Sequence, residues 1–261
     1  MVSVFKTVAE QMITHLEEVL SDWLFEHSLA RNWYVYGGLA SEMYMIPSQD
    51  LRFIGNANAK RRSEFIGGRW CAHRALEEIG FAAASIPMGT LGAPLWPIGT
   101  VGSITHDGGV CLALVTDSQS MIGLGIDLFD VERAYKCDYL ADLFLSPSEI
   151  LHVLKHHKPN GYAHLFSAKE SVVKAISLSI GSLIDLHDIE ITFTGSLFSA
   201  TVAGYANVIK GRCQRYDRFI LSYACLESPL RAKPLDHVQV SINTESSPRH
   251  YPLNRCKTLF S

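Results

Sequence analysis

The 261-residue sequence has few of the features that mark disulfide-rich, zinc-ribbon or membrane-spanning proteins. Its six cysteines form no C-x-x-C pair and no dense group, which excludes those two cysteine-based scaffolds and favours reduced thiols. No stretch approaches the roughly 20 apolar residues of a membrane-spanning helix. The net charge is -3, so the chain has no excess of Lys and Arg. Proteins that bind nucleic acid mainly through its phosphates have such an excess. We therefore expect a cytoplasmic protein with no nucleic-acid partner and no membrane span.

The N-terminal half is predicted to contain helices and a hairpin. Apolar residues recur at every fourth position from Val4 to Leu20 and predict an amphipathic opening helix. A second helix is predicted over about 58–80. The stretch 87–109 is rich in proline and glycine and predicts a long shaped loop that runs into a hairpin. The pair Asp107-Gly108 is expected near the turn of this hairpin.

The C-terminal half repeats this mixture of helices and short strands. With 48% hydrophobic residues, the chain can bury one large core or two modest ones. We predict an α+β fold of two similar lobes, each a short antiparallel sheet packed with helices, related by a pseudo-twofold axis. The expected units are an N-terminal lobe at 1–120, a C-terminal lobe at 121–227 and a peripheral tail at 228–261. The predicted C-terminal elements are a strand at 121–129, helices at 138–156 and 167–180, a hairpin at 189–202 and a strand at 218–227.

The segment "MIGLGIDLFDVE" is apolar or small up to Asp127 and returns to apolar residues directly after it. Side chains alternate along a strand, so Gly123, Gly125, Asp127 and Phe129 share one face. Glycines within a strand indicate that something approaches the backbone closely, and a ligand is one candidate. The alternative is that Asp127 only ends the strand and caps the next segment.

The segment "FSAKESVVKAI" reads as a helix start. Ser167 and Glu170 have the spacing of a capping box, and Glu170 and Lys174 have that of a favourable ion pair. Neither feature explains Lys169, a cation in the expected first turn, where the helix dipole disfavours positive charge. A phosphate held at this helix N-terminus would account for it.

A third group of polar residues lies in "AKRRSEFIGGRWCAHRAL". Arg62 and Arg69 lie almost on one helical line, with Arg61 on an adjacent face. Gly67 and Gly68 each weaken a helix by up to ~1 kcal/mol, which indicates a close approach to that face. The alternative interpretation is an ordinary solvated basic face.

Taken together, the order and spacing of these motifs resemble the 4′-phosphopantetheinyl transferases of the enterobactin-synthase component D and surfactin type. The pattern comprises the Arg-rich helix "KRRSEFIGGRWCAHRAL", the block "PLWPIGTVGSITH", the strand end "GIDLF" and the helix "FSAKESVVKA". The resemblance covers about residues 40–225.

This resemblance implies a Mg²⁺-dependent transfer. The phosphopantetheine arm of coenzyme A would pass to a serine of an apo-carrier protein of fatty-acid, polyketide or nonribosomal peptide synthesis, releasing 3′,5′-ADP. The pathway expected is siderophore or secondary-metabolite biosynthesis, and the protein is expected to be a monomer. The implied catalytic residues are Asp127, Glu170 and Lys174, the metal ligands are Asp127, Glu170 and Leu128 through its carbonyl, and the coenzyme A contacts are Arg61, Arg69, Ser103, Thr105, His106, Lys169 and Lys174.

Two departures from the family pattern stand out. Many relatives have a carboxylate two residues after the Asp of the strand, where this sequence has Phe129. Relatives often carry a basic residue in the loop before Trp96, but Met88 and Leu91 are apolar here. The first departure motivates the alternative of a degenerate, non-catalytic homologue that binds coenzyme A or a carrier protein.

Two further alternatives have less support in the sequence. A thiol hydrolase would use Cys71 or Cys111, but neither lies in a nucleophile motif. A metal site at His152 and His156 has helical spacing, yet His and Lys also suit the C-terminal end of a helix.

Overall fold

The computed structural model describes residues 7–26, 33–42, 44–82, 85–89, 91–119, 121–156 and 159–227. Val4 of the predicted opening helix and the predicted tail at 228–261 lie outside these residues. The elements run in two groups along the chain. The first group is α1 (Val8–Glu26), β1 (Trp33–Leu39), α2 (Ser48–Leu51), α3 (Ala59–Glu78), β2 (Thr100–Asp107) and β3 (Val110–Asp117).

The second group begins after β3 and alternates differently, with the helices first and most of the strands last. It consists of β4 (Met121–Asp130), η1 (Val131–Arg133), α4 (Ala134–Leu140), η2 (Ala141–Leu143), α5 (Pro147–His156), α6 (Gly161–Ile180), η3 (Leu186–Asp188), β5 (Ile189–Thr194), β6 (Leu197–Val202), β7 (Tyr205–Tyr216) and β8 (Phe219–Glu227).

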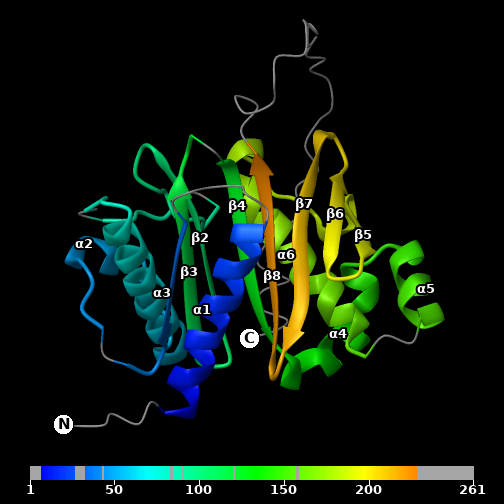
Figure 1. The fold of residues 1–261 in the computed structure, drawn as a ribbon, viewed down its shortest axis with the longest axis horizontal. Coiled ribbons are helices and arrows are strands. Elements are labelled where there is room, and N and C mark those ends of the chain that lie inside the picture. The colour runs from blue at the N-terminus through cyan, green and yellow to red at the C-terminus, as the bar shows by residue number, and fades with distance from the viewer. Residues whose placement is uncertain are drawn as a thin grey trace, which may run out of the picture.

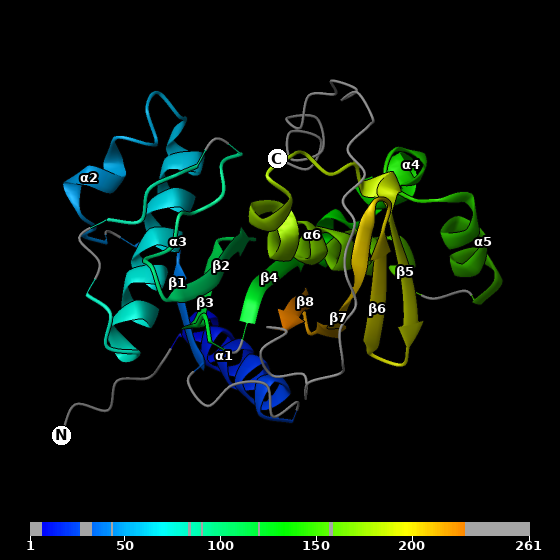
Figure 2. The ribbon, with the colours of Figure 1, turned by 90° about the horizontal axis from the view of Figure 1, so that it is seen from above.

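The strands form two antiparallel sheets, one of three strands in the order β1-β3-β2 and one of five in the order β4-β8-β7-β6-β5. Helices α3 and α1 cover opposite faces of the smaller sheet, and α6 covers the larger sheet on the side away from α1 (Figures 1 and 2). The predicted α+β fold with two helix-packed antiparallel sheets is therefore confirmed.

Helix α1 joins the two sheets through one apolar core. Its buried residues, among them Leu16 and Leu20, belong to the same cluster as Leu112 of β3 and Leu128 of β4. The chain passes from one sheet to the other between β3 and β4, near residue 120. This core contains residues from both predicted lobes. The division of the chain into lobes at 1–120 and 121–227 therefore stays a prediction.

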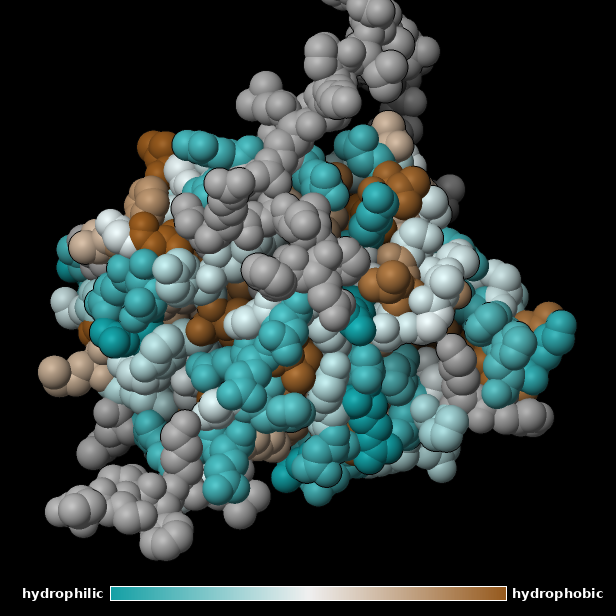
Figure 3. All heavy atoms as spheres, in the orientation of Figure 1, coloured by the Kyte–Doolittle hydropathy of each residue, from teal (hydrophilic) through white to brown (hydrophobic). Residues whose placement is uncertain are grey.

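The outer face of α1 is polar, as its amphipathic pattern predicts. Hydrophilic side chains gather over α1 on the face shown in Figure 3, where hydrophobic residues form only small separate patches. Within the described ranges, no helix is both long and apolar enough to cross a membrane.

Two predicted helix boundaries were wrong. The segment predicted as one helix at 138–156 contains α4 and α5, which the turn at η2 separates before Pro147. Helix α6 begins at Gly161, six residues before the predicted start at 167. Ser167 therefore lies in the interior of α6, and the capping box is absent there. The actual capping box opens α5, where the Ser146 amide donates to Glu149 Oε2 and the Glu149 amide donates to Ser146 Oγ.

The glycines of β4 admit the backbone of α6. A Cβ atom at Gly125 would overlap the carbonyl oxygen of Ser171, and one at Gly123 would overlap that of Ala175. The close approach predicted from these glycines is thus confirmed, but α6 makes it and not a ligand. Gly67 and Gly68 play the same part on α3, whose face packs against Cys111 and Ile104 of the smaller sheet.

Replacing Gly125 by alanine is expected to lower the free energy of unfolding by about 1–3 kcal/mol, because overpacking forces β4 and α6 apart. Gly89→Ala is a suitable control, since its new methyl group would meet the movable side chain of Leu95 at 3.1 Å and the Ala93 carbonyl oxygen at an ordinary contact distance of 3.5 Å. Urea unfolding of both variants measures the difference. An unchanged stability for Gly125→Ala would contradict the observed packing.

Candidate active site at the contact between the two sheets

Asp127 and Lys174 form an ion pair between β4 and α6. The Lys174 Nζ atom lies 2.7 Å from Asp127 Oδ1, 2.9 Å from the Ile126 carbonyl oxygen and 3.3 Å from Thr105 Oγ1. The Asp127 side chain is about nine-tenths buried. Burial raises its pKa, Lys174 lowers it, and the neighbouring Glu170 raises it, so that the pKa of Asp127 lies above its ordinary value. Burial and the neighbouring Glu170 therefore destabilise the ionised form of Asp127, and a bound cation would stabilise it.

Glu170 lies one turn before Lys174 on α6 and is 8% exposed. The predicted ion pair between Glu170 and Lys174 is not formed, because Lys174 binds Asp127 instead. Within the described part of the chain, no group donates a hydrogen bond to the Glu170 carboxylate. Its carboxylate oxygens are not among the buried atoms that lack a partner, so they reach solvent. Glu170 is thus a largely buried residue whose carboxylate is accessible beside that of Asp127.

The prediction that Lys169 binds a phosphate was wrong. Lys169 is fully buried, and its ammonium donates to Glu149 Oε2 at 2.6 Å and to the carbonyl oxygens of Phe144 and Leu186 at 2.9 Å each. These three bonds use all the donors of an ammonium. The physical reason for the error is that α6 begins earlier than predicted, so Lys169 lies inside the helix and not at its N-terminus.

The two hydroxyls predicted to contact coenzyme A turn instead toward β4. Ser103 Oγ accepts from the Ile126 amide and Thr105 Oγ1 accepts from the Leu128 amide, each at 3.0 Å. Both residues are 3% exposed. As side chains alternate along β2, the next residue, His106, points to the other side, toward Arg61 and Glu64 of α3. One face of β2 thus contacts β4 through Ser103 and Thr105, and the other face carries His106, which contacts Arg61 of α3.

A basic group is centred on Arg61 and His106. The Arg61 Nη1 and His106 Nε2 atoms are 2.8 Å apart, and His106 Nδ1 lies 3.5 Å from Glu64 Oε2. Because a guanidinium has donors only, Arg61 donates and His106 Nε2 accepts in this contact. Arg61 is exposed and is thus free to turn toward an anion. Of the two arginines that the sequence left open by geometry, Arg61 and not Arg62 contacts His106.

Arg69 lies on α3 two turns after Arg61 and is 5% exposed. Its guanidinium carbon lies 4.9 Å from the centre of the Phe65 ring, and its Nε atom has no hydrogen-bond partner within the described ranges. Burial lowers the pKa of Arg69 to about 10, which leaves the group cationic at neutral pH. An unsatisfied, buried guanidinium N–H is a feature that an anionic ligand would complete.

The ring of Phe129 packs in the core of the larger sheet. Phe129 lies on the same face of β4 as Asp127, as alternation predicts, but is 2% exposed and contacts Phe166 edge-on at 5.8 Å between ring centres. Asp130 points away and binds Arg218. The carboxylate that many relatives have at this position is thus replaced by an aromatic contact.

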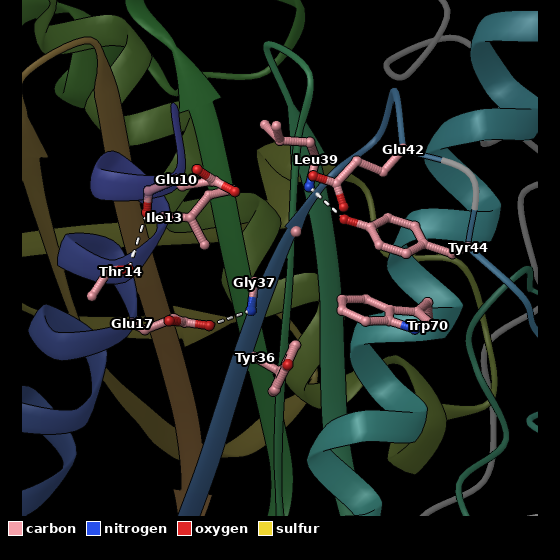
Figure 4. A pocket seen from close by; sticks show the side chains of 11 residues that line it. Glu10, Ile13, Thr14, Glu17, Tyr36, Gly37, Leu39, Glu42, Tyr44 and Trp70 are labelled. Carbon is pink, nitrogen blue, oxygen red and sulfur yellow. Dashed lines mark hydrogen bonds between the residues drawn. The ribbon is translucent and has the colours of Figure 1, made fainter. Parts of the chain in front are cut away.

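Two cavities lie elsewhere and contain none of the predicted site residues. One, of about 290 Å³, lies between α1, β1 and α3, where Glu17 accepts from the Gly37 amide and Tyr44 from the Leu39 amide (Figure 4). The other, of about 520 Å³, lies between α5, the start of α6 and strands β5–β7.

The alternative sites from the sequence gain no support. Cys71 and Cys111 are buried, and burial raises the pKa of both thiols, that of Cys111 to about 12, so neither is a ready nucleophile. The rings of His152 and His156 lie 4.4 Å apart near the end of α5. Among the described residues, no group of three or more metal-binding side chains surrounds them.

Comparison with known proteins agrees with this arrangement. Residues 49–116 match the 4′-phosphopantetheinyl transferase N-terminal domain family, and residues 123–222 match the 4′-phosphopantetheinyl transferase superfamily. The 4′-phosphopantetheinyl transferase Svp of Streptomyces mobaraensis is 34% identical over 176 residues, which cover 66% of this chain and 70% of Svp. The chain belongs to the 4′-phosphopantetheinyl transferase superfamily. The first matched region ends within β3, and the second begins within β4 and includes Asp127, Glu170 and Lys174.

Other members of the superfamily are similar over shorter regions. The 4′-phosphopantetheinyl transferase Npt of Nocardia iowensis is 45% identical over 74 residues, or 28% of this chain and 33% of Npt. Enterobactin synthase component D of Salmonella typhimurium is 33% identical over 139 residues, or 52% of this chain and 56% of that protein. The chain thus spans between one third and about half of the length of these two relatives.

Proposed function

We propose that this protein transfers the 4′-phosphopantetheine arm of coenzyme A to a serine of an apo-carrier protein and releases 3′,5′-ADP. The observation that carries this proposal is the pair of carboxylates, Asp127 and Glu170, beside the Lys174 ammonium. Such a group of charges suits a reaction in which a proton is removed near a pyrophosphate. The membership of the superfamily supports the same reaction.

The chain's own residues have separate roles in this transfer. The serine oxygen of the carrier forms a bond to the phosphorus that bears the pantetheine arm, and the bond from this phosphorus to the oxygen of 3′,5′-ADP breaks. Glu170, to which no described residue donates a hydrogen bond, takes the serine proton directly or through a water. Lys174 stabilises the negative charge that grows on the departing phosphate. Arg61, Arg69 and His106 bind the nucleotide end and its 3′-phosphate.

The carboxylates also fit a Mg²⁺ ion. Asp127 and Glu170 supply hard anionic oxygens, and the missing donor at Glu170 leaves room for a cation partner. The Leu128 amide points to the β2 edge of β4, and the carbonyl of the same residue shares that edge. These three residues would hold the ion. When bound, Mg²⁺ would neutralise charge on the pyrophosphate.

The remaining features of the proposal concern setting and partners. A single chain carries both the basic group on α3 and the carboxylates on β4 and α6, so the reaction needs no second copy and a monomer suffices. The five described cysteines are free, as in a reducing cytoplasm. The carriers are those of fatty-acid, polyketide or nonribosomal peptide synthesis, including siderophore pathways, as for the enterobactin synthase relative.

Analysis of the released nucleotide tests this function. The protein is incubated with coenzyme A, Mg²⁺ and apo-carriers of the three classes, and the products are separated by chromatography. We expect 3′,5′-ADP to form only when a carrier is present, and EDTA to stop its formation. Binding of coenzyme A without any release of nucleotide would favour the non-catalytic homologue.

Arginine variants on α3 test the nucleotide contacts. Replacing Arg61 by alanine is expected to weaken coenzyme A binding by about 1.5–3 kcal/mol, the value of a lost hydrogen bond to a charged group. Arg62→Ala is the matched control, because Arg62 is also exposed and occupies the next position of the helix. Calorimetric titration of both variants separates the two residues. Equal binding by both would mean that this helix face is only solvated.

A further inference from the structure

The contact between the two sheets depends on side chains of β2 and amides of β4. Every second residue of β2 accepts a hydrogen bond from every second amide of β4: Ser103 from Ile126, Thr105 from Leu128 and Asp107 from Asp130. Strand β4 is the edge of its sheet, so these amides have no strand partner on this side. The three side chains of β2 satisfy them instead.

This row of contacts fixes the backbone on both sides of Asp127. The amide of residue 126 binds Ser103 and that of residue 128 binds Thr105, so the smaller sheet holds the peptide segment that carries the carboxylate. Both bonds measure 3.0 Å, and both hydroxyl residues are 3% exposed. Ser103 and Thr105 are thus closely matched in their contact with β4.

Thr105 differs from Ser103 in one contact. Its Oγ1 atom also lies 3.3 Å from the Lys174 Nζ atom. A hydroxyl oxygen has two lone pairs and can accept from an amide and an ammonium together. The three donors of Lys174 are then used by Asp127, the Ile126 carbonyl and Thr105. The last is the contact that reaches Lys174 from the smaller sheet.

We propose that Thr105 is a positioning residue, which holds the Lys174 ammonium in place for the transfer reaction without touching the substrate. The role rests on the proposed function, since it matters for catalysis only if Lys174 stabilises the departing phosphate. The sequence assigned Thr105 to coenzyme A binding. In the proposed role Thr105 instead connects the smaller sheet to α6, the helix that carries Lys174. Ser103, which makes the same bond to β4, lacks this role.

The pair Thr105→Val and Ser103→Ala tests the proposal. Each variant removes one hydroxyl and leaves one β4 amide without its acceptor, so we expect similar decreases in Tm. We expect kcat to fall about tenfold in Thr105→Val, the factor that about 1.4 kcal/mol of barrier gives, with an unchanged KM for coenzyme A. Ser103→Ala, which loses the bond to β4 but no contact with Lys174, should lower kcat clearly less than Thr105→Val does, and Thr105→Ser should restore it. Equal decreases in kcat for the valine and alanine variants would overturn the proposal.

A second measurement does not depend on the reaction. Acylation of Lys174 by an amine-reactive reagent is followed by peptide mass spectrometry in the free protein. We expect faster labelling of Lys174 in Thr105→Val than in Ser103→Ala or the wild type, and equal labelling in all three would overturn the proposal. If the wild type transfers no phosphopantetheine, the proposed function fails, while this labelling still decides whether Thr105 holds Lys174.

Discussion

Replacing Glu170 by glutamine is expected to lower kcat for phosphopantetheine transfer by about 10²–10⁴, the range that general-base catalysis contributes. The amide has the size of the carboxylate but cannot take the serine proton. Glu170 is 8% exposed and has no hydrogen-bond donor among the described residues, so its replacement leaves no partner unsatisfied. The rate of 3′,5′-ADP formation measures the effect.

Two controls separate catalysis from folding. Glu78→Gln changes an exposed glutamate of α3 in the same way and should leave kcat unchanged. The Tm of Glu170→Gln should stay at or above that of the wild type, because a neutral side chain relieves its repulsion with Asp127. A decrease in kcat of less than tenfold would mean that Glu170 is not the base.

Replacing Lys169 by methionine is expected to lower the free energy of unfolding by about 3–5 kcal/mol, since it leaves the Glu149 carboxylate buried without its cation. Lys169 and Glu149 are fully or almost fully buried, and their atoms are 2.6 Å apart. Glu149 also accepts from the Ile191 amide at 3.0 Å, so the pair joins α5, α6 and β5. Urea unfolding measures the loss.

The double variant Lys169→Met, Glu149→Gln shows whether the unpaired charge causes this loss. Glutamine removes the charge and keeps one oxygen for the Ile191 amide, so we expect the double variant to regain part of the stability. The folded fraction of Lys169→Met should bind coenzyme A as the wild type does. If Lys169→Met bound coenzyme A more weakly but unfolded at the same urea concentration as the wild type, Lys169 would contact a phosphate of coenzyme A. This result would contradict its buried ion pair with Glu149.

The sequence allowed much of the fold to be predicted, because period-two and helical patterns act locally. The hairpins, β4, β8 and α3 lie close to their predicted ranges, and the Asn58 side chain caps α3 by accepting from the Arg61 amide. The start of α6 was predicted wrongly, because Ser167 and Glu170 share the spacing of a capping box with Ser146 and Glu149. Only the second pair lies at a helix start, and spacing alone does not distinguish them.

The candidate site was predictable in its residue types but less so in its partners. Asp127, Glu170 and Lys174 were recognisable from their motifs, whereas the pairing of Lys174 with Asp127 depends on how closely α6 approaches Gly125. The contacts of Ser103 and Thr105 with β4 were missed. Their signal was the alternation of Ser103, Thr105 and Asp107 along one face of β2, which indicates a polar edge facing a neighbour and not a ligand.

The intact mass of an apo-carrier protein after incubation tests the proposed function most directly. The carrier is incubated with this protein, coenzyme A and Mg²⁺, and its mass is compared with that from a parallel incubation with Glu170→Gln. We expect the wild type to increase the carrier's mass by one phosphopantetheine arm, attached to a single serine, and the variant to leave the carrier unmodified over the same time. An unmodified acyl, peptidyl and aryl carrier with the folded wild-type protein would contradict a transferase built on Asp127, Glu170 and Lys174.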